Sequence, residues 1–203
     1  MLRNVCCGKG EYMPPKCKFT KEEIIEAALE MVKADGIEAV TARALGAKLG
    51  TSSKPVFGLF QNMDELLQQV IRAARDEYNK YIKIGLAQES AFKGVGLQYI
   101  LFAKNEPKLF QLLFMTQQNE KMDAAGTLPM IDDNYRQILL SVQKMYGLDE
   151  DDSKRLYRHL WIYTHGIGAL LATGVCCFSE QEIGGMMTEV CQGLLLRMKE
   201  SRL

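Results

Sequence analysis

The chain has 203 residues, of which 47% are hydrophobic and 25% are charged, and its formal net charge is zero. This length allows one large domain or two small ones, and the hydrophobic content is sufficient for a core. The balanced charge excludes a protein coated in positive charge but allows a local basic surface. Because only five residues are proline and no alternating strand pattern persists, we expect an all-α fold.

The sequence has no recognisable segment for export or for crossing a membrane. The N-terminus lacks the apolar region of a signal peptide, and the longest nearly apolar run, residues 166–178, is too short to span a bilayer. We therefore expect a cytoplasmic protein with no membrane partner.

The chain begins with a glycine- and proline-containing basic stretch, residues 1–18, which predicts a flexible arm. Such an arm could touch DNA phosphates or the minor groove, although most leaders of this kind are simply disordered. The first helix should follow, because Thr20 and Glu23 have the spacing of a capping box. Apolar residues then recur at helical spacing as far as Gly36, where we expect the helix to end.

Residues 40–60 predict two short helices around a tight turn, which is a helix-turn-helix. Thr41 is placed to cap the first helix, and Gly50 is placed to leave it in a left-handed conformation. Ser52 is placed to cap the second helix, with Pro55 in its first turn, where a missing N–H has no cost.

The charge of this segment indicates a nucleic-acid partner. Residues 39–63 contain no Asp or Glu, whereas Arg43, Lys48 and Lys54 are all present. A DNA duplex attracts Lys and Arg, and counterion release supplies much of the affinity. Small donors and a cation at the start of the second helix suit a recognition helix in the major groove. The alternative is an ordinary helical hairpin with a solvated polar face.

A long fourth helix is expected after Asn62 and Glu65, which have the spacing of another capping box. A helix of about twenty residues extends roughly 30 Å, which is enough to join a small head to a separate body. We place the boundary near Tyr81. The chain then divides into the arm (1–18), a helix-turn-helix domain with its connecting helix (19–81) and a ligand-binding and dimerisation domain (82–203).

Five helical segments are expected in this second domain, with a polar loop at 115–128. The segments are 91–105, 107–115, 129–146, 151–175 and 180–199. Their starts carry recognisable signals, since four acidic residues at 149–152 complement a helix N-terminus and Ser179 with Glu182 forms another capping box.

The body holds most of the aromatic residues and methionines, as in an apolar small-molecule site with a few polar groups. Trp161 and His165 are four residues apart and share a helix face, where His165 could bond a ligand in a pH-sensitive manner. The alternative is that these residues fill the core and His165 bonds a neighbouring carbonyl. The candidate effector-binding residues are Tyr99, Phe102, Phe110, Phe114, Met115, Trp161, Tyr163 and His165.

The last two helices are rich in glycine, which costs roughly 1 kcal/mol relative to alanine inside a helix. This composition indicates close helix–helix approach, either at a dimer seam or within one subunit. Six cysteines without an export signal predict free thiols. Two groups, Cys6, Cys7 and Cys17, and Cys176, Cys177 and Cys191, could bind a soft metal or sense oxidants. Neither group has paired C-x-x-C spacing, so we expect no metal site and no cofactor. The chain has no nucleotide-binding or hydrolase motif and only two histidines, which argues against an enzyme.

Two stretches resemble the TetR/AcrR family of one-component regulators. The first covers residues 19–70, and its carrying positions are Thr20, Gly36, Val40, Thr41, Leu45, Gly50, Ser52, Phe57, Phe60, Leu66 and Leu67. The second resembles the tryptophan-histidine-glycine class of C-terminal TetR domain, on Trp161-x-x-x-His165-Gly166 together with Phe102, Ala103, Pro107, Leu109, Phe110 and residues 112–114.

The resemblance implies an all-helical homodimer that binds double-stranded operator DNA and is released by a small, apolar effector. It implies a DNA surface made of Lys18, Thr41, Arg43, Thr51, Ser52, Ser53, Lys54 and Phe57. Phe57 matches a position where a tyrosine hydroxyl usually contacts a phosphate, and Met63 one where a lysine is frequent. Both departures imply either weaker anchoring to the DNA backbone or compensation by Lys18 and the N-terminal arm. The rival hypotheses are a helical adaptor that kept the head but binds another protein, and a small enzyme working in the body cavity.

Overall fold

Ten α-helices and no β-strand make up the parts of the chain that the computed structural model describes, residues 19–116 and 124–200. This confirms the all-α prediction. The helices are α1 Lys21–Asp35, α2 Ala42–Lys48, α3 Lys54–Leu59, α4 Met63–Leu86, α5 Ala91–Asn105, α6 Pro107–Phe114, α7 Ala124–Ile131, α8 Tyr135–Tyr146, α9 Glu150–Ala172 and α10 Glu180–Glu200. None of them is long and apolar enough to cross a membrane.

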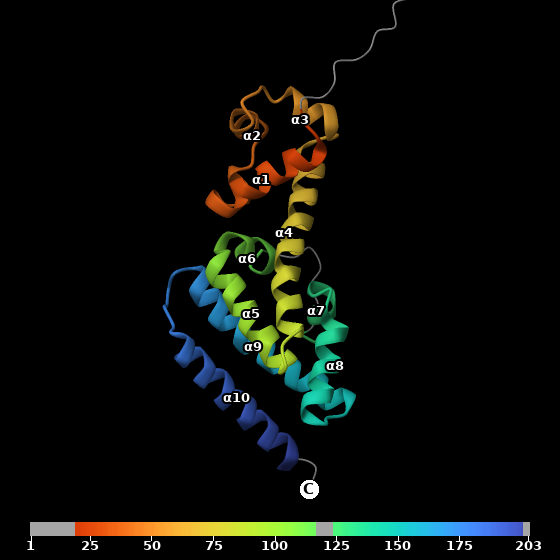
Figure 1. Ribbon diagram of the computed structural model, residues 1–203, viewed down its shortest axis with the longest axis vertical. Coiled ribbons are helices and arrows are strands. Elements are labelled where there is room, and N and C mark those ends of the chain that lie inside the picture. The colour runs from red at the N-terminus through yellow and green to blue at the C-terminus, as the bar shows by residue number, and fades with distance from the viewer. Residues whose placement is uncertain (1–18, 117–123, 201–203) are drawn as a thin grey trace, which may run out of the picture.

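The molecule is elongated, with a small head and a larger helical body (Figure 1). Helices α1, α2 and α3 form the head at one end of α4, and α5 to α10 gather around its other end (Figure 1). The predicted arm, residues 1–18, lies outside the described residues.

The first helix begins as the sequence predicts. The Thr20 hydroxyl accepts the N–H of Glu23 at 3.1 Å, and the Glu23 carboxylate accepts the N–H of Thr20 at 2.8 Å. These two bonds satisfy amides that have no partner within the helix. The helix ends at Gly36, which has a φ of 93°. Glycine adopts this positive φ without strain, whereas a residue with a Cβ would be strained.

Helix α4 continues without a break from the head core into the body core. Its 24 residues extend roughly 36 Å. Its buried stripe is Leu66, Val70, Ala74, Tyr78, Ile82 and Gly85. Asn62 caps the helix by accepting the N–H of Glu65 at 2.8 Å. The Glu65 carboxylate accepts from Gln61 N–H at 2.6 Å, so only half of the predicted capping box forms.

Two glycines allow α4 and α5 to cross with their backbones in contact. A Cβ on Gly94 would lie 2.5 Å from the carbonyl oxygen of Gly85, and a Cβ on Gly85 would lie 2.7 Å from the backbone of Val95. Both distances are below van der Waals contact. This crossing fixes the direction in which the body helices leave the connecting helix.

The segment between α6 and α8 differs from the prediction. The structure places a helix, α7, where a loop was expected, and Pro129 lies inside that helix. The single helix predicted for residues 129–146 is interrupted after Ile131, because the Asp132 carboxylate accepts the N–H of Asn134 at 2.8 Å and turns the chain. The predicted ranges of α5, α6, α9 and α10 agree with the structure to within three residues at each end.

The turn between α2 and α3 gives a clean test of backbone conformation. Gly50 has a φ of +63° and no atom within 4 Å of a Cβ built on it, so an alanine there would meet backbone strain and no steric clash. We expect Gly50→Ala to lower the free energy of unfolding by about 1–2 kcal/mol. Urea denaturation followed by circular dichroism measures this.

Gly58→Ala is the matched control, since Gly58 also has open space around it but lies inside α3 without a positive φ. There alanine should be neutral or stabilising by up to about 1 kcal/mol. Equal effects of the two substitutions would contradict the conformational requirement at Gly50.

Candidate nucleic-acid interface and ligand cavity

The tight turn of the head is built by local hydrogen bonds. Thr41 caps α2 by accepting the N–H of Ala44 at 3.2 Å, as the sequence predicts. The N–H of Thr51 then donates to the carbonyl of Gly46 at 2.9 Å, after the chain has turned through Gly50. A Cβ on Gly46 would lie 3.0 Å from the carbonyl carbon and oxygen of Ser52. Gly46 therefore permits the close approach of α2 to the turn, a role that its position, four residues before Gly50, could have suggested.

The start of α3 is shifted by one residue from the prediction. Ser53, and not Ser52, occupies the N-cap position, and its side chain makes no capping bond. The Ser52 hydroxyl accepts the N–H of Lys54 at 3.4 Å, which is a long hydrogen bond. Val56 and Phe60 are buried against the head core and hold α3 in place.

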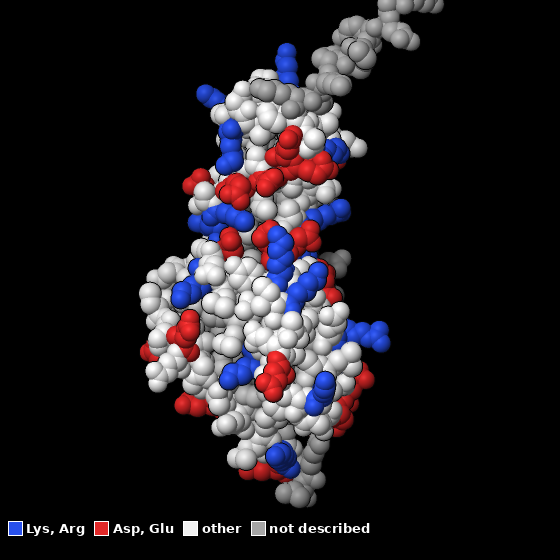
Figure 2. Space-filling model, in the orientation of Figure 1, with Lys and Arg blue, Asp and Glu red and all other residues white. Residues whose placement is uncertain are grey.

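The outer end of the head presents cations without neighbouring acids. Arg43, Lys48 and Lys54 are exposed, and none forms an ion pair with the described residues. On the face shown in Figure 2, Lys and Arg project from the end farthest from the body, while Asp and Glu form a band nearer the body. The charge pattern expected from residues 39–63 therefore survives in three dimensions as a basic end.

The other candidate DNA contacts lie around the same turn. Thr41 and Ser52 are exposed, and Thr51 and Ser53 are half-buried. Phe57 is 52% exposed on α3, a large fraction for a phenylalanine. Lys18 lies outside the described residues. The structure thus brings seven of the eight candidate residues to one end of the head.

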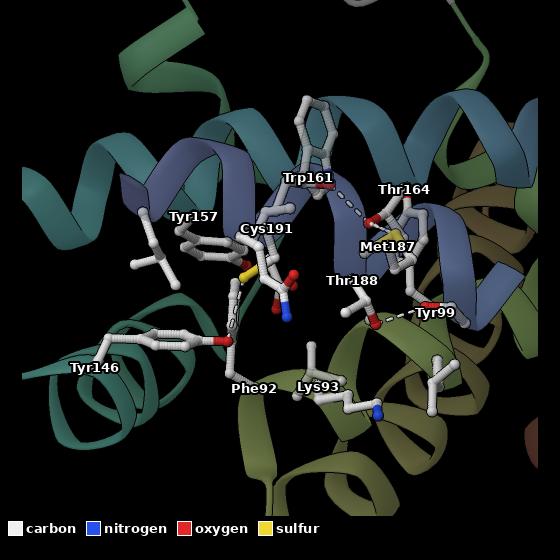
Figure 3. Close-up of a pocket in the computed structure, with 18 of the residues that line it drawn as sticks. Phe92, Lys93, Tyr99, Tyr146, Tyr157, Trp161, Thr164, Met187, Thr188 and Cys191 are labelled. Carbon is white, nitrogen blue, oxygen red and sulfur yellow. Dashed lines mark hydrogen bonds between the residues drawn. The ribbon is translucent and has the colours of Figure 1, made fainter. Parts of the chain in front are cut away.

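A cavity of about 400 Å³ lies in the body between α5, α9 and α10 (Figure 3). Helices α4 and α8 and the turn before α8 complete its wall. Its lining is mainly aromatic and aliphatic, with a few hydroxyl, thiol and charged groups, which is typical of a small-molecule site. In Figure 3, Tyr146, Tyr157 and Cys191 lie toward one end, and Tyr99, Trp161, Thr164 and Met187 toward the other.

Only two of the eight candidate effector residues, Tyr99 and Trp161, line this cavity. Phe102 and Phe110 are fully buried, and Phe114 packs beside them in the core. Met115, at the end of α6, is 43% exposed. Tyr163 packs against a separate apolar cluster of Ile100, Ile167 and Ile183. For these residues the packing is that of a core or a surface and not of a cavity wall.

His165 lies behind the wall, where it connects the cavity to α6. Its Nδ1 is hydrogen-bonded to the Tyr99 hydroxyl at 3.0 Å. Its ring stacks on Trp161 and on Phe110 with interplanar angles of 27° in both cases. Burial lowers the pKa of His165, which favours the neutral imidazole. Its hydrogen-bond partner in the structure is therefore a tyrosine hydroxyl, and not the neighbouring carbonyl considered from the sequence.

Several cavity residues were missed by sequence reasoning because they come from distant segments. Tyr78 belongs to the buried stripe of α4 and also lines the cavity. Tyr157 lies one helical turn before Trp161 on α9, a spacing that could have identified it. Tyr146 and Cys191 meet across the cavity from α8 and α10, with 3.3 Å between the hydroxyl oxygen and Sγ.

Asp132 is the one carboxylate among the lining residues, and it is only 4% exposed. Its Oδ2 accepts the hydroxyl of Tyr78 at 2.8 Å, and its Oδ1 accepts the N–H of Asn134 at 2.8 Å. Burial raises the pKa of Asp132, and these hydrogen bonds oppose the shift. The carboxylate forms no ion pair with the described residues.

The thiols and acids of the described residues do not gather into a metal site. No group of three or more His, Cys, Asp or Glu side chains in residues 19–116 and 124–200 is arranged to hold an ion. Cys176, Cys177 and Cys191 are free thiols. Cys6, Cys7 and Cys17 lie outside the described residues.

The head is similar to a known regulatory family. Residues 24–70 match the family described as bacterial regulatory proteins, tetR family, so this segment is a TetR-type N-terminal domain. Over 164 residues the chain is 24% identical to an uncharacterized HTH-type transcriptional regulator of Mycobacterium tuberculosis (strain ATCC 25618 / H37Rv), covering 78% of this chain and 72% of that protein. These similarities and the basic end of the head support a DNA-binding transcription regulator.

The bond between Tyr78 and Asp132 should contribute to stability. Tyr78→Phe removes the donor and leaves a buried carboxylate with fewer partners, so we expect the free energy of unfolding to fall by about 1.5–3 kcal/mol. The control is Tyr81→Phe on the same helix, because the Tyr81 hydroxyl has no partner among the described residues. That change should stay within about 0.5 kcal/mol. Urea denaturation measures the free energy of unfolding of both variants. Equal decreases would show that the hydrogen bond between Tyr78 and Asp132 contributes nothing to stability.

Proposed function

We propose that this protein is a ligand-responsive transcriptional repressor, which binds a palindromic operator as a homodimer and is released by a small apolar effector. The observation that carries the proposal is the acid-free basic end of a TetR-type helix-turn-helix domain. We propose a regulator and not an enzyme.

DNA binding would place α3 in the major groove. Lys54 stands at its first position, and Ser53 precedes it, so a cation and a small donor lead the helix. The exposed side chains of Arg43 and Lys48 on α2 are suited to the flanking phosphates. The exposed ring of Phe57 cannot donate to a phosphate as tyrosine would, but it can contact a thymine methyl group.

Dimerisation is supported by an exposed face on α9 and α10. Ile162 is 50% exposed and Leu170 is 37% exposed on α9, with Gly166 between them, and Leu196 is 64% exposed on α10. A Cβ on Gly166 or Gly193 would meet no atom within 4 Å, so these glycines have no close neighbour in their own subunit. By contrast, a Cβ on Gly168 would lie 2.9 Å from the Phe110 ring, so that glycine serves packing within the subunit.

Effector release would act through the contact between head and body. Helix α6 packs against α1 and α4, and the Lys108 side chain reaches to 4.0 Å from a Cβ built on Gly36 at the end of α1. The other side of α6 carries Phe110, which stacks on His165 behind the cavity wall. A ligand that displaces Tyr99 or Trp161 would thus shift α6 and bias the spacing of the two heads away from that of the operator.

A protein-binding adaptor is the second candidate, because the exposed ring of Phe57 also suits a protein partner. The two functions differ in their dependence on salt. Phosphate contacts make affinity fall steeply as salt rises, whereas an apolar protein contact changes little. A direct titration with DNA therefore separates them.

Lys54→Ala should weaken binding to operator DNA selected from genomic fragments. The slope of log affinity against log salt should become shallower by about 1 for each Lys54 that contacts a phosphate. The control is Lys144→Ala, because Lys144 is exposed on α8 in the body and should not approach DNA. Fluorescence anisotropy over a salt series measures both. Salt-insensitive binding, or no binding to any fragment, would reject the repressor proposal.

Ile162→Arg should convert the dimer to a monomer, because a guanidinium in an apolar helix seam has no partner. Leu140→Arg is the control, since Leu140 is similarly exposed, at 56%, on α8, outside the proposed seam. Sedimentation velocity should show a halved mass for the first variant alone. A monomeric wild-type protein would contradict the proposed dimer. Dissociation of both variants would show that the dimer interface is not confined to the proposed face of α9 and α10.

A further inference from the structure

We infer that the cavity binds a lipophilic cation, with an ammonium-type charge seated beside Asp132 and an apolar body along α5, α9 and α10. This inference rests on the proposed ligand-responsive function, because it names the chemical class of the effector. It follows from three features of the described residues: a buried acid without a cation, the tyrosine rings around it, and the apolar remainder of the wall.

The first feature is an acid in an unusual place. Asp132 is 4% exposed at the wall of a mainly apolar cavity, and no Lys, Arg or His of the described residues pairs with it. A carboxylate removed from water and not paired with a cation carries a large desolvation cost. The bonds from Tyr78 and Asn134 offset part of that cost. A ligand cation would offset more of this desolvation cost, so the cavity should bind a cationic ligand more tightly than a neutral one.

The second feature is a group of rings around that acid. Tyr78, Tyr99 and Tyr157 all line the cavity. The Tyr78 hydroxyl donates to Asp132 Oδ2 at 2.8 Å. Burial, and then the negative charge of Asp132, raises the pKa of all three hydroxyls. The rings of Tyr78 and Tyr99 meet edge to face with centroids 6.0 Å apart. Aromatic rings attract cations through their π faces, and more strongly where water is excluded.

The third feature is the apolar character of the remaining wall. Val95, Leu160, Met187 and Leu195 contribute aliphatic and thioether surface, and about 400 Å³ accommodates a ligand of drug-like size. The polar groups on the α10 side are neutral, namely Thr188 and Gln192. The site therefore matches a molecule with one charged group and a hydrocarbon or aromatic body.

An amphiphilic anion is the opposite possibility, because Lys93 also lines the cavity (Figure 3). Lys93 is exposed, so water and salt screen its charge, whereas the charge of Asp132 is buried and screened much less. The buried charge therefore outweighs the exposed one.

A purely structural Asp132 is the remaining alternative, since its bond to Tyr78 joins the turn before α8 to α4. In that case, removal of the Asp132 charge would weaken the binding of all ligands of the cavity to a similar extent. A role in recognition predicts instead a selective loss of cationic ligands.

The test measures the binding of three probes with the same hydrocarbon chain: decyltrimethylammonium, decyl alcohol and decanoate. Trp161 is the single tryptophan of the chain and lines the cavity, so its fluorescence reports occupancy directly and without DNA. In the wild-type protein, below the micelle concentration of each probe, we expect the cation to bind at least about tenfold more tightly than the alcohol or the acid. Equal or tighter binding of the alcohol or of decanoate overturns the proposal.

The matched variants are Asp132→Asn and Asp133→Asn, which remove one negative charge at adjacent positions. Asp133 is exposed and does not line the cavity. We expect Asp132→Asn to weaken binding of the cation by at least about tenfold and binding of the alcohol by less than about threefold. In Asp133→Asn the affinity for the cation should stay within about twofold of the wild-type value. Parallel losses for the cation and the alcohol in Asp132→Asn would overturn the proposal, and the wild-type ranking decides alone if this variant does not fold.

The same probes separate this inference from the repressor proposal. Release of operator DNA by decyltrimethylammonium, but not by decyl alcohol at equal concentration, supports both. DNA binding that responds to the alcohol and not to the cation leaves the repressor standing and overturns the cation site. Selective cation binding by a protein that binds no DNA supports the cation site and rejects the repressor.

Discussion

The buried stripe of α4 is the constraint on which the rest of the structure depends. Leu66 and Val70 near the head, and Tyr78 and Ile82 near the body, belong to one continuous cluster of buried residues. A helix buried along its whole length cannot bend freely between the two parts, because each turn is held by packing. Head and body are therefore joined by one continuous helix that packs against both.

This continuity gives physical content to the proposed regulation. Tyr78 lies in the buried stripe and also donates its hydroxyl to Asp132 at the cavity wall. On the other side of the body, the stack of Trp161, His165 and Phe110 leads from the cavity to α6, which packs against α1. The head is thus reached from the cavity by two packed routes. Both routes consist of close contacts, and close-packed contacts transmit small displacements well.

The parts of the fold that could be predicted from the sequence are those set by local interactions. The capping bonds of Thr20, Thr41 and Ser179 involve residues three apart in the sequence, and all three form as expected. The left-handed Gly50 likewise depends only on its own backbone. The range of one helix was wrong: residues 129–146 were predicted as a single helix, which the turn at Asp132 interrupts.

The cavity could not be predicted in the same way, because its wall combines five helices and a turn. Composition identified the body as the aromatic part, but it could not tell which aromatic side chains face the core. Phe102 and Phe110 face inward and are fully buried, whereas Tyr99, on the same helix as Phe102, reaches the cavity. Asp132 was hidden for a second reason. The residues 129–146 read as one helix, and within a helix an aspartate is expected on the solvent side.

Helix α10 links the two proposals that concern the body. One of its sides carries Met187 and Cys191 into the cavity wall, and another carries the exposed Gly193 and Leu196 that suit a partner subunit. Only Ile183 and Met198 of this helix are buried, so its packing within the subunit is light. A helix held weakly by its own subunit takes its position from whatever lies on its two sides. In the proposed dimer those are the ligand and the partner, so occupation of the cavity and the geometry of the seam are set by the same element.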